Sequence, residues 1–190
     1  MSARLPIADK LSSDVQPLLE AIALAARAHS GQLRKDGQTP YASHAFRVCM
    51  VLRHVFGIDD PPALLAAALH DTIEDTTVDF DDLEGQFGKA VAEWVALLSK
   101  DKRLPEPARE KAYVENLDKA PWQVKVCKLA DVYDNLMDSV HSPPHQRARV
   151  FRNAHRYLDA LEPSLPEQGR RPWKLVSELL AETESGSGGV

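Results

Sequence analysis

Apolar residues recur along the chain at intervals of three and four positions, the spacing that keeps them on one face of an α-helix. No stretch alternates apolar and polar residues with a period of two for long enough to indicate a sheet. The pattern therefore predicts an all-α fold.

Local signals mark where the first helices begin and end. A first helix is predicted from Asp14, an N-cap residue type, to the polar stretch that begins at Gly31. Ser43 is expected to cap a second helix, which ends at Gly57. The apolar spacing predicts the buried residues of both helices: Val15, Leu18, Leu19, Ile22 and Ala25 in the first, and Phe46, Val51, Leu52 and Val55 in the second.

The segment that follows Asp60 is apolar on all sides. Its sequence, PPALLAAALHD, opens with the proline typical of a helix start and then contains only alanine and leucine up to His70. Such a helix is expected at the centre of the fold, buried on most of its circumference. His70 and Asp71 then lie where it leaves the core.

Six further helices are predicted, at about 80–87, 89–99, 107–119, 121–139, 144–161 and 172–182. The last residues, 184–190, read ESGSGGV and have the composition of a flexible tail. Residues 1–183 are expected to form one domain, for which a chain of 190 residues and 21.0 kDa has the usual size.

Composition and charge narrow the class of protein. With 44% hydrophobic and 27% charged residues, the chain is typical of a soluble globular protein. No apolar run approaches the roughly 20 residues of a membrane span and the start lacks a signal-peptide pattern, so we expect a cytoplasmic location and no membrane partner. A net charge of -5 with a pI near 5.8 argues against a nucleic-acid partner. Cys49 and Cys127 have no metal-binding spacing and are predicted to be buried free thiols.

Four residues are candidate ligands of a divalent metal ion. His70 and Asp71 end an apolar helix, His44 comes at the start of the second helix, and Asp131 lies within the mostly apolar segment QVKVCKLADVYDNLMDSV. Neutral imidazole and carboxylate are ordinary ligands of such ions. Alone, His44 fits a capping or surface histidine and Asp131 a solvated helix face, but an unpaired carboxylate beside a core is costly and a metal partner would remove that cost.

Further polar residues adjoin these ligands in sequence. Glu74 and Asp75, in TIEDTT, are placed to exchange protons with a metal-activated water, although an acidic helix N-terminus is the alternative reading. Asn135 follows Asp131 by four residues, so both share one helical face. It is therefore expected to donate or accept a hydrogen bond at the same site.

Three segments together resemble a known family: AARAHSGQLRKDGQTPYASH, LLAAALHDTIEDT and VKVCKLADVYDN. In order and spacing, over about residues 21–135, they are similar to the hydrolase domain of RelA/SpoT proteins. The resemblance implies an HD-type helical bundle with the metal site between central helices, and a manganese enzyme that removes pyrophosphate from the 3′ position of ppGpp and pppGpp. Because the chain has no room for synthetase and regulatory domains, it resembles the stand-alone small alarmone hydrolases, such as the metazoan SpoT homologue, which also accepts NADPH.

The resemblance also implies roles for individual residues. It assigns manganese coordination to His44, His70, Asp71 and Asp131, catalysis to Glu74 and Asp75, and substrate contacts to Arg34, Lys35, Lys102 and Asn135. For Lys102 and its neighbour Arg103, ordinary solvated loop charges are an equal alternative.

Three positions depart from the family pattern. Ala45 replaces a frequent proline, and Val132 and Asp134 stand where a basic residue and a histidine or tyrosine are frequent. We expect Val132 and Asp134 to line the face near Asn135, which weakens the inference of guanine recognition. Two alternatives therefore remain: a phosphohydrolase acting on NADPH or another nucleotide, and a non-catalytic alarmone-binding protein. In each case the partner is a small-molecule nucleotide, and a homo-oligomer is possible.

Overall fold

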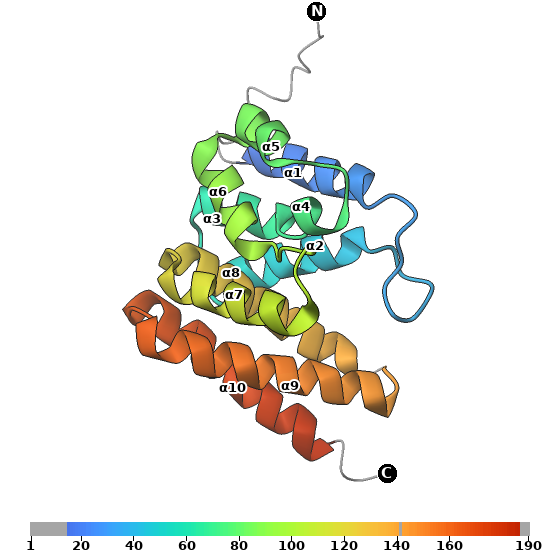
Figure 1. The fold of residues 1–190 in the computed structure, drawn as a ribbon, viewed down its shortest axis with the longest axis vertical. Coiled ribbons are helices and arrows are strands. Elements are labelled where there is room, and N and C mark those ends of the chain that lie inside the picture. Colours follow the sequence, from blue (N-terminus) through green and yellow to red (C-terminus); the bar gives the residue numbers. More distant parts are fainter. Residues whose placement is uncertain (1–14, 141, 187–190) are drawn as a thin grey trace, which may run out of the picture.

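The structure, a computed structural model, describes residues 15–140 and 142–186. Across these ranges the chain forms helices and no strand, with a single isolated bridge between Leu33 and Pro40. The elements in order are α1 (Val15–Ala28), α2 (Ala42–Met50) with its π-helical continuation η2 (Val51–Val55), α3 (Pro61–Leu69), α4 (Thr72–Asp75), α5 (Phe80–Phe87), α6 (Lys89–Leu98), α7 (Glu106–Lys119), α8 (Trp122–Ser139), α9 (Pro144–Leu161), the short 3-10 helix η3 (Glu162–Ser164) and α10 (Glu167–Gly186) (Figure 1). The predicted all-α class is confirmed.

Helix α3 lies at the centre of the first half of the fold. The carboxylate of Asp60 accepts a hydrogen bond from the backbone nitrogen of Ala63 at 3.0 Å and caps the helix. Every residue from Ala63 to Leu69 is buried, and α3 packs against α1, α2, α6 and α8. Small alanine side chains let these neighbours approach from all sides, so the predicted central position is confirmed.

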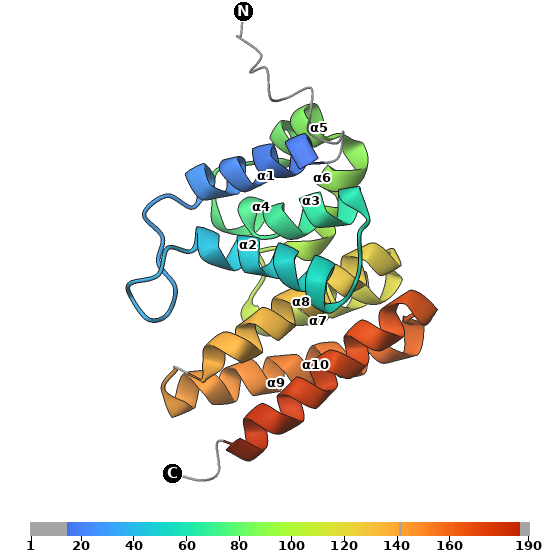
Figure 2. The same ribbon diagram turned by 180° about the vertical axis from the view of Figure 1, so that it is seen from behind.

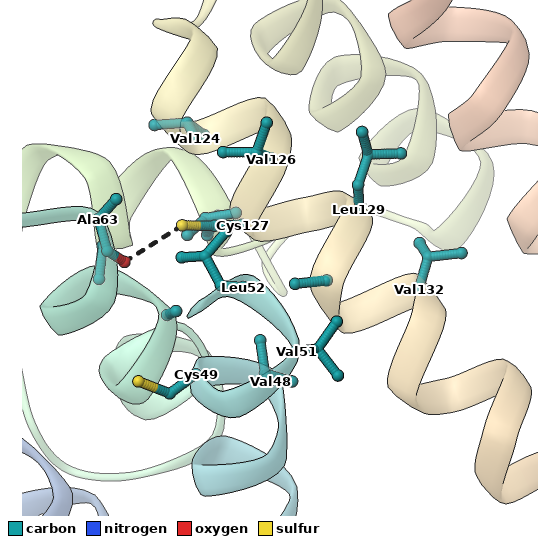
Figure 3. Packing of buried hydrophobic residues seen from close by; sticks show 14 of the residues in the cluster. Val48, Cys49, Val51, Leu52, Ala63, Val124, Val126, Cys127, Leu129 and Val132 are labelled. Atoms are coloured by element: carbon teal, nitrogen blue, oxygen red, sulfur yellow. Dashed lines mark hydrogen bonds between the residues drawn. The ribbon is translucent and has the colours of Figure 1, made fainter. Parts of the chain in front are cut away.

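Helix α8 separates two groups of helices. Both views place α1 to α6 on one side of it and α9 with α10 on the other (Figures 1 and 2). The residues from Val124 to Val132 are buried without interruption. The thiol of Cys127 donates to the carbonyl oxygen of Ala63 at 3.3 Å, which fixes α8 against α3 (Figure 3). Cys49 and Cys127 are both buried and free, as predicted.

Three side chains at the starts of the first helices differ from the predictions. Leu19 is 52% exposed and Phe46 is 46% exposed, because α1 and α2 turn smaller residues inward, chiefly alanines and Val48. Ser43 does not cap α2: the helix already begins at Ala42, and the Ser43 hydroxyl is buried with no hydrogen-bond partner among the described residues. The predicted cap Asp14 lies outside the described residues.

The last helix is longer than predicted at both ends. It begins at Glu167 and carries Pro172 inside its second turn, and it continues through Gly186. Three residues of the predicted tail are therefore helical, and residues 187–190 lie outside the described part of the chain. No helix in the described ranges is both long enough and apolar enough to cross a membrane.

Candidate metal centre

Three candidate ligands meet where α2, α3 and α8 converge. His44 lies in the first turn of α2, His70 directly follows α3, and Asp131 lies in the middle of α8. One ligand atom from each lies within 4.8 Å of the others. The Nε2 atom of His44 is 3.1 Å from Oδ1 of Asp131, and Nε2 of His70 is 3.8 Å from the same oxygen. All three side chains are buried.

Asp71 brings a fourth donor to the same point. Its Oδ2 atom lies 3.0 Å from Nε2 of His70 and 3.7 Å from Nε2 of His44. The hydroxyl of Tyr41 donates to the same oxygen at 2.5 Å and holds the carboxylate in place. The centre thus consists of two imidazole nitrogens and two carboxylate groups.

The imidazole of His70 is arranged to face a cation. Its Nδ1 atom lies 2.9 Å from the carbonyl oxygen of Ala67, so the neutral ring, which is the form that binds a metal ion, carries its proton on Nδ1 and its lone pair on Nε2. This buried Nε2 makes no hydrogen bond of normal geometry with the described residues. Burial lowers the pKa of His70, but the carboxylates of Asp71 and Asp131 outweigh it and raise the pKa to about 9. The site therefore attracts positive charge, and its donor set fits a divalent metal ion.

Lys128 lies behind Asp131 and did not emerge from the sequence as a site residue. Its Nζ atom is 2.6 Å from Oδ2 of Asp131 and 4.3 Å from the centre of the Tyr157 ring. Burial lowers the pKa of Lys128, but Asp131 raises it well above the ordinary value, so the side chain stays charged. The amide of Asn135 donates to Oδ1 of Asp131 at 2.6 Å. Its position one helical turn before Asp131 is the signal in the sequence that could have identified Lys128 as a site residue.

The acidic pair predicted for proton transfer lies beside the ligands. The Glu74 carboxylate accepts a hydrogen bond from the backbone nitrogen of Lys100 at 2.8 Å, and burial raises its pKa. Asp75 forms an ion pair with Lys102. Both acids line the same cleft as the ligand residues.

This cleft has a volume of about 710 Å³, within the usual range for small-molecule sites. One wall carries the metal ligands and the acidic pair. The other is built from α9, whose His145, Gln146, Arg149, Asn153 and Tyr157 were not recognised in the sequence. Lys35 reaches the cleft from the loop before α2, and α9 adds the positive charge of Arg149. An anionic ligand would therefore lie between cations and the metal centre.

Comparison with known proteins identifies this arrangement. Residues 21–156 match the HD domain family. The chain belongs to the HD domain family.

The most similar relatives include two vertebrate proteins named guanosine-3′,5′-bis(diphosphate) 3′-pyrophosphohydrolase MESH1. The protein from Xenopus tropicalis is 40% identical over 135 residues, which cover 70% of this chain and 75% of that protein. The human protein is 42% identical over 129 residues, which cover 67% and 72%. One solved structure is described as a metazoan ortholog of SpoT that hydrolyzes ppGpp. It is 32% identical to this chain with a TM-score of 0.77, and the match covers 95% of this chain and 98% of the chain in that structure. The resemblance noted in the sequence is confirmed.

The residues predicted to contact substrate in this HD domain have different surroundings. Lys35 and Asn135 line the cleft, whereas Arg34 turns away from it. The Arg34 guanidinium lies 2.8 Å from the Asp138 carboxylate and its side chain is only 8% exposed, so it anchors the loop to α8. Lys102 is paired with Asp75 and lies outside the cleft lining.

Val132 and Asp134, the two α8 residues that depart from the family pattern, face different surroundings in this HD domain. Val132 lines the cleft, as expected. Asp134 does not: it is 1% exposed and faces α2, where its carboxylate contacts His44 and Arg47. The expectation that Asp134 lies on the substrate face is wrong. Consecutive residues of a helix are about 100° apart, so Asp134 falls on the other side of Asp131 from Val132 and Asn135, and this side faces α2.

Proposed function

We propose that this protein is a manganese-dependent 3′-pyrophosphohydrolase that converts ppGpp and pppGpp into GDP or GTP and pyrophosphate. The observation that carries the proposal is the convergence of His44, His70 and Asp131, with Asp71 beside them, on a cleft whose opposite wall bears Arg149. Relatives about 40% identical to this chain carry the name of this activity. The chain covers most of the length of those relatives.

The residues of the metal wall would prepare the attack on phosphorus. His44, His70, Asp71 and Asp131 would hold the ion through imidazole nitrogens and carboxylate oxygens. When bound, a divalent ion supplies Lewis acidity that activates water and withdraws charge from a phosphoryl oxygen. Lys128 keeps Asp131 ionised and directed into the cleft, because its ammonium group lies 2.6 Å from the outer carboxylate oxygen.

Glu74 is the stronger candidate for the general base. Burial raises its pKa, which favours proton uptake by the carboxylate, and the Lys100 backbone N–H fixes the direction of that carboxylate. It would take the proton of the water that attacks the phosphorus next to the ribose. The bond from that phosphorus to the ribose 3′ oxygen would break, which releases pyrophosphate, and Asp75 would assist the delivery of a proton to the departing 3′ oxygen. Lys35 and Arg149 would hold phosphate oxygens by charge-assisted hydrogen bonds.

Asn135 and Val132 occupy the part of the cleft next to Asp131, where a nucleoside would lie. The Asn135 amide nitrogen is bound to Asp131 and its oxygen lies 3.5 Å from Arg34, so the side chain is fixed. Val132 offers no hydrogen bond to a base. This apolar contact is compatible with bases other than guanine, which favours hydrolysis of NADPH or another nucleotide as the second candidate function. The acidic pair beside the ligands argues against a purely alarmone-binding role.

A substrate panel tests the proposal. Purified protein would be incubated with Mn²⁺ and, separately, ppGpp, NADPH, GTP and ATP, and the products would be separated by ion-exchange chromatography. We expect the fastest turnover with ppGpp and the release of intact pyrophosphate. Faster turnover of NADPH would make the second candidate the function. Faster turnover of GTP or ATP than of ppGpp and NADPH would overturn the 3′-pyrophosphohydrolase and leave hydrolysis of another nucleotide.

A further inference from the structure

The two metal-binding histidines receive their support from different sources. Nδ1 of His70 lies 2.9 Å from a carbonyl oxygen of its own helix, that of Ala67. His44 lies in the first turn of α2, where the carbonyl oxygen of Tyr41 already accepts its backbone N–H. Its Nδ1 instead lies 2.7 Å from Oδ2 of Asp134, a carboxylate supplied by α8.

Asp134 is held at that position from its other side. The Nε atom of Arg47, one turn after His44, lies 2.6 Å from Oδ1 of Asp134, and the guanidinium of Arg34 lies 3.7 Å from Oδ2. Asp134 is 1% exposed, and a buried carboxylate is stable only when such partners compensate its charge. Arg47 and Arg34 therefore hold its carboxylate in the position that faces His44.

A neutral imidazole has one N–H and one lone pair. If Nδ1 carries the N–H and donates a hydrogen bond to Asp134, the lone pair lies on Nε2. This atom faces Asp131 at 3.1 Å and Asp71 at 3.7 Å. We propose that Asp134 is a positioning residue of the metal centre, which fixes the ring orientation and the tautomer of His44 so that Nε2 can coordinate a divalent ion. The proposal rests on metal binding by the proposed enzyme and on none of its substrates.

The experiment measures Mn²⁺ affinity of the full-length protein by electron paramagnetic resonance of the free ion. Partners of this kind typically change metal affinity by about 10- to 100-fold, so Asp134→Ala should weaken binding by that factor. Asp134→Asn keeps an oxygen that can accept the Nδ1–H but loses the charge, so its affinity should fall between those of Asp134→Ala and the wild type.

Asp138→Asn is the matched control. Asp138 lies one turn after Asp134 and pairs with Arg34 and Arg47, but within the described part of the chain no hydrogen bond or ion pair joins it to His44. The control should bind Mn²⁺ as tightly as the wild type, which separates positioning of the ligand from general loss of the arginine network. Circular dichroism of the metal-free proteins shows whether each variant is folded.

The outcomes are distinguishable. Wild-type affinity in both Asp134 variants, or an equal loss in Asp138→Asn, would overturn the proposal while leaving the metal centre intact. If Asp134→Ala does not fold, the comparison of Asp134→Asn with Asp138→Asn decides. Failure of the wild type itself to bind divalent ions would instead overturn the proposed function.

Discussion

The two walls of the cleft are built in opposite ways. On the metal wall the ligands His44, His70 and Asp131 are buried, with exposed fractions of 1%, 4% and 8%, and each is held by at least one close polar contact. On the α9 wall the polar side chains His145 and Arg149 are exposed, whereas Tyr157 is buried. Arg149 forms no ion pair within the described part of the chain. Burial gives the first wall the fixed geometry that coordination requires, while the second wall can adapt to different anionic ligands.

This contrast predicts complete loss of function from one wall and graded loss from the other. The largest effect is expected for Asp131→Ala, which should abolish Mn²⁺ binding and turnover. It also leaves Lys128 buried without its carboxylate, and removal of one partner of a buried pair costs about 3–5 kcal/mol in the free energy of unfolding. Metal analysis and thermal unfolding would check both effects.

A double variant separates the two effects of that change. Asp131→Ala combined with Lys128→Met removes both charges, so the free energy of unfolding should recover while metal binding stays absent. Restored metal binding in the double variant would contradict the assignment of Asp131 as a ligand.

Next in size are the effects of the acidic pair on the metal wall. Glu74→Gln and Asp75→Asn should keep the metal but lower kcat, because general acid-base assistance is commonly worth about 10²- to 10⁴-fold. Glu74→Gln should lower kcat more than Asp75→Asn does, because the Asp75 carboxylate is already engaged in an ion pair with Lys102. Rates near those of the wild type in both variants would show that these residues serve only as acidic residues at a helix N-terminus.

Smaller effects are expected for two cations that line the cleft, Lys35 in the loop before α2 and Arg149 on α9. Lys35→Ala and Arg149→Ala should each raise KM roughly tenfold, the effect of losing about 1.5 kcal/mol in a hydrogen bond to a charged group, and leave metal affinity unchanged. Lys174→Ala is the control, because Lys174 pairs with Glu178 on α10, away from the cleft. Unchanged KM in both cleft variants would show that phosphate groups bind elsewhere.

The smallest expected effect is a shift in the pH profile. Desolvation raises the pKa of Glu74, and a general base must be ionised to act. Activity at saturating Mn²⁺ should therefore fall on the acidic side at a higher pH than an ordinary glutamate would give. Glu74→Gln should remove this acidic limb, and its persistence in that variant would assign the limb to another group.

The same contrast explains what the sequence could predict. The burial of α3 followed from its unbroken run of alanine and leucine, and this run also placed His70 and Asp71 at the exit from the core. On α1 the pattern did not distinguish Leu19 from the alanines that face α3, because small residues allow close helix packing that hydrophobicity alone does not reveal.

Contacts between distant segments could not be read from local patterns. Arg34 binds Asp138 from 104 residues away, and His44 meets Asp134 from 90 residues away. The α9 wall likewise depends on how α9 packs against α8, which helical periodicity does not determine. Residue types and positions indicated the four candidate ligands and the resemblance to the RelA/SpoT family supported them, whereas the residues that hold these ligands in place became visible only in the fold.

The central claim is that the converging His44, His70, Asp71 and Asp131 make this chain a metal-dependent 3′-pyrophosphohydrolase. The most direct test is to strip the purified protein with a chelator, add ppGpp with and without Mn²⁺, and follow the products by phosphorus NMR. We expect no reaction in the stripped protein, and stoichiometric GDP and pyrophosphate once Mn²⁺ is restored. Formation of GDP at the same rate without metal, or release of single phosphates in place of pyrophosphate, would contradict it.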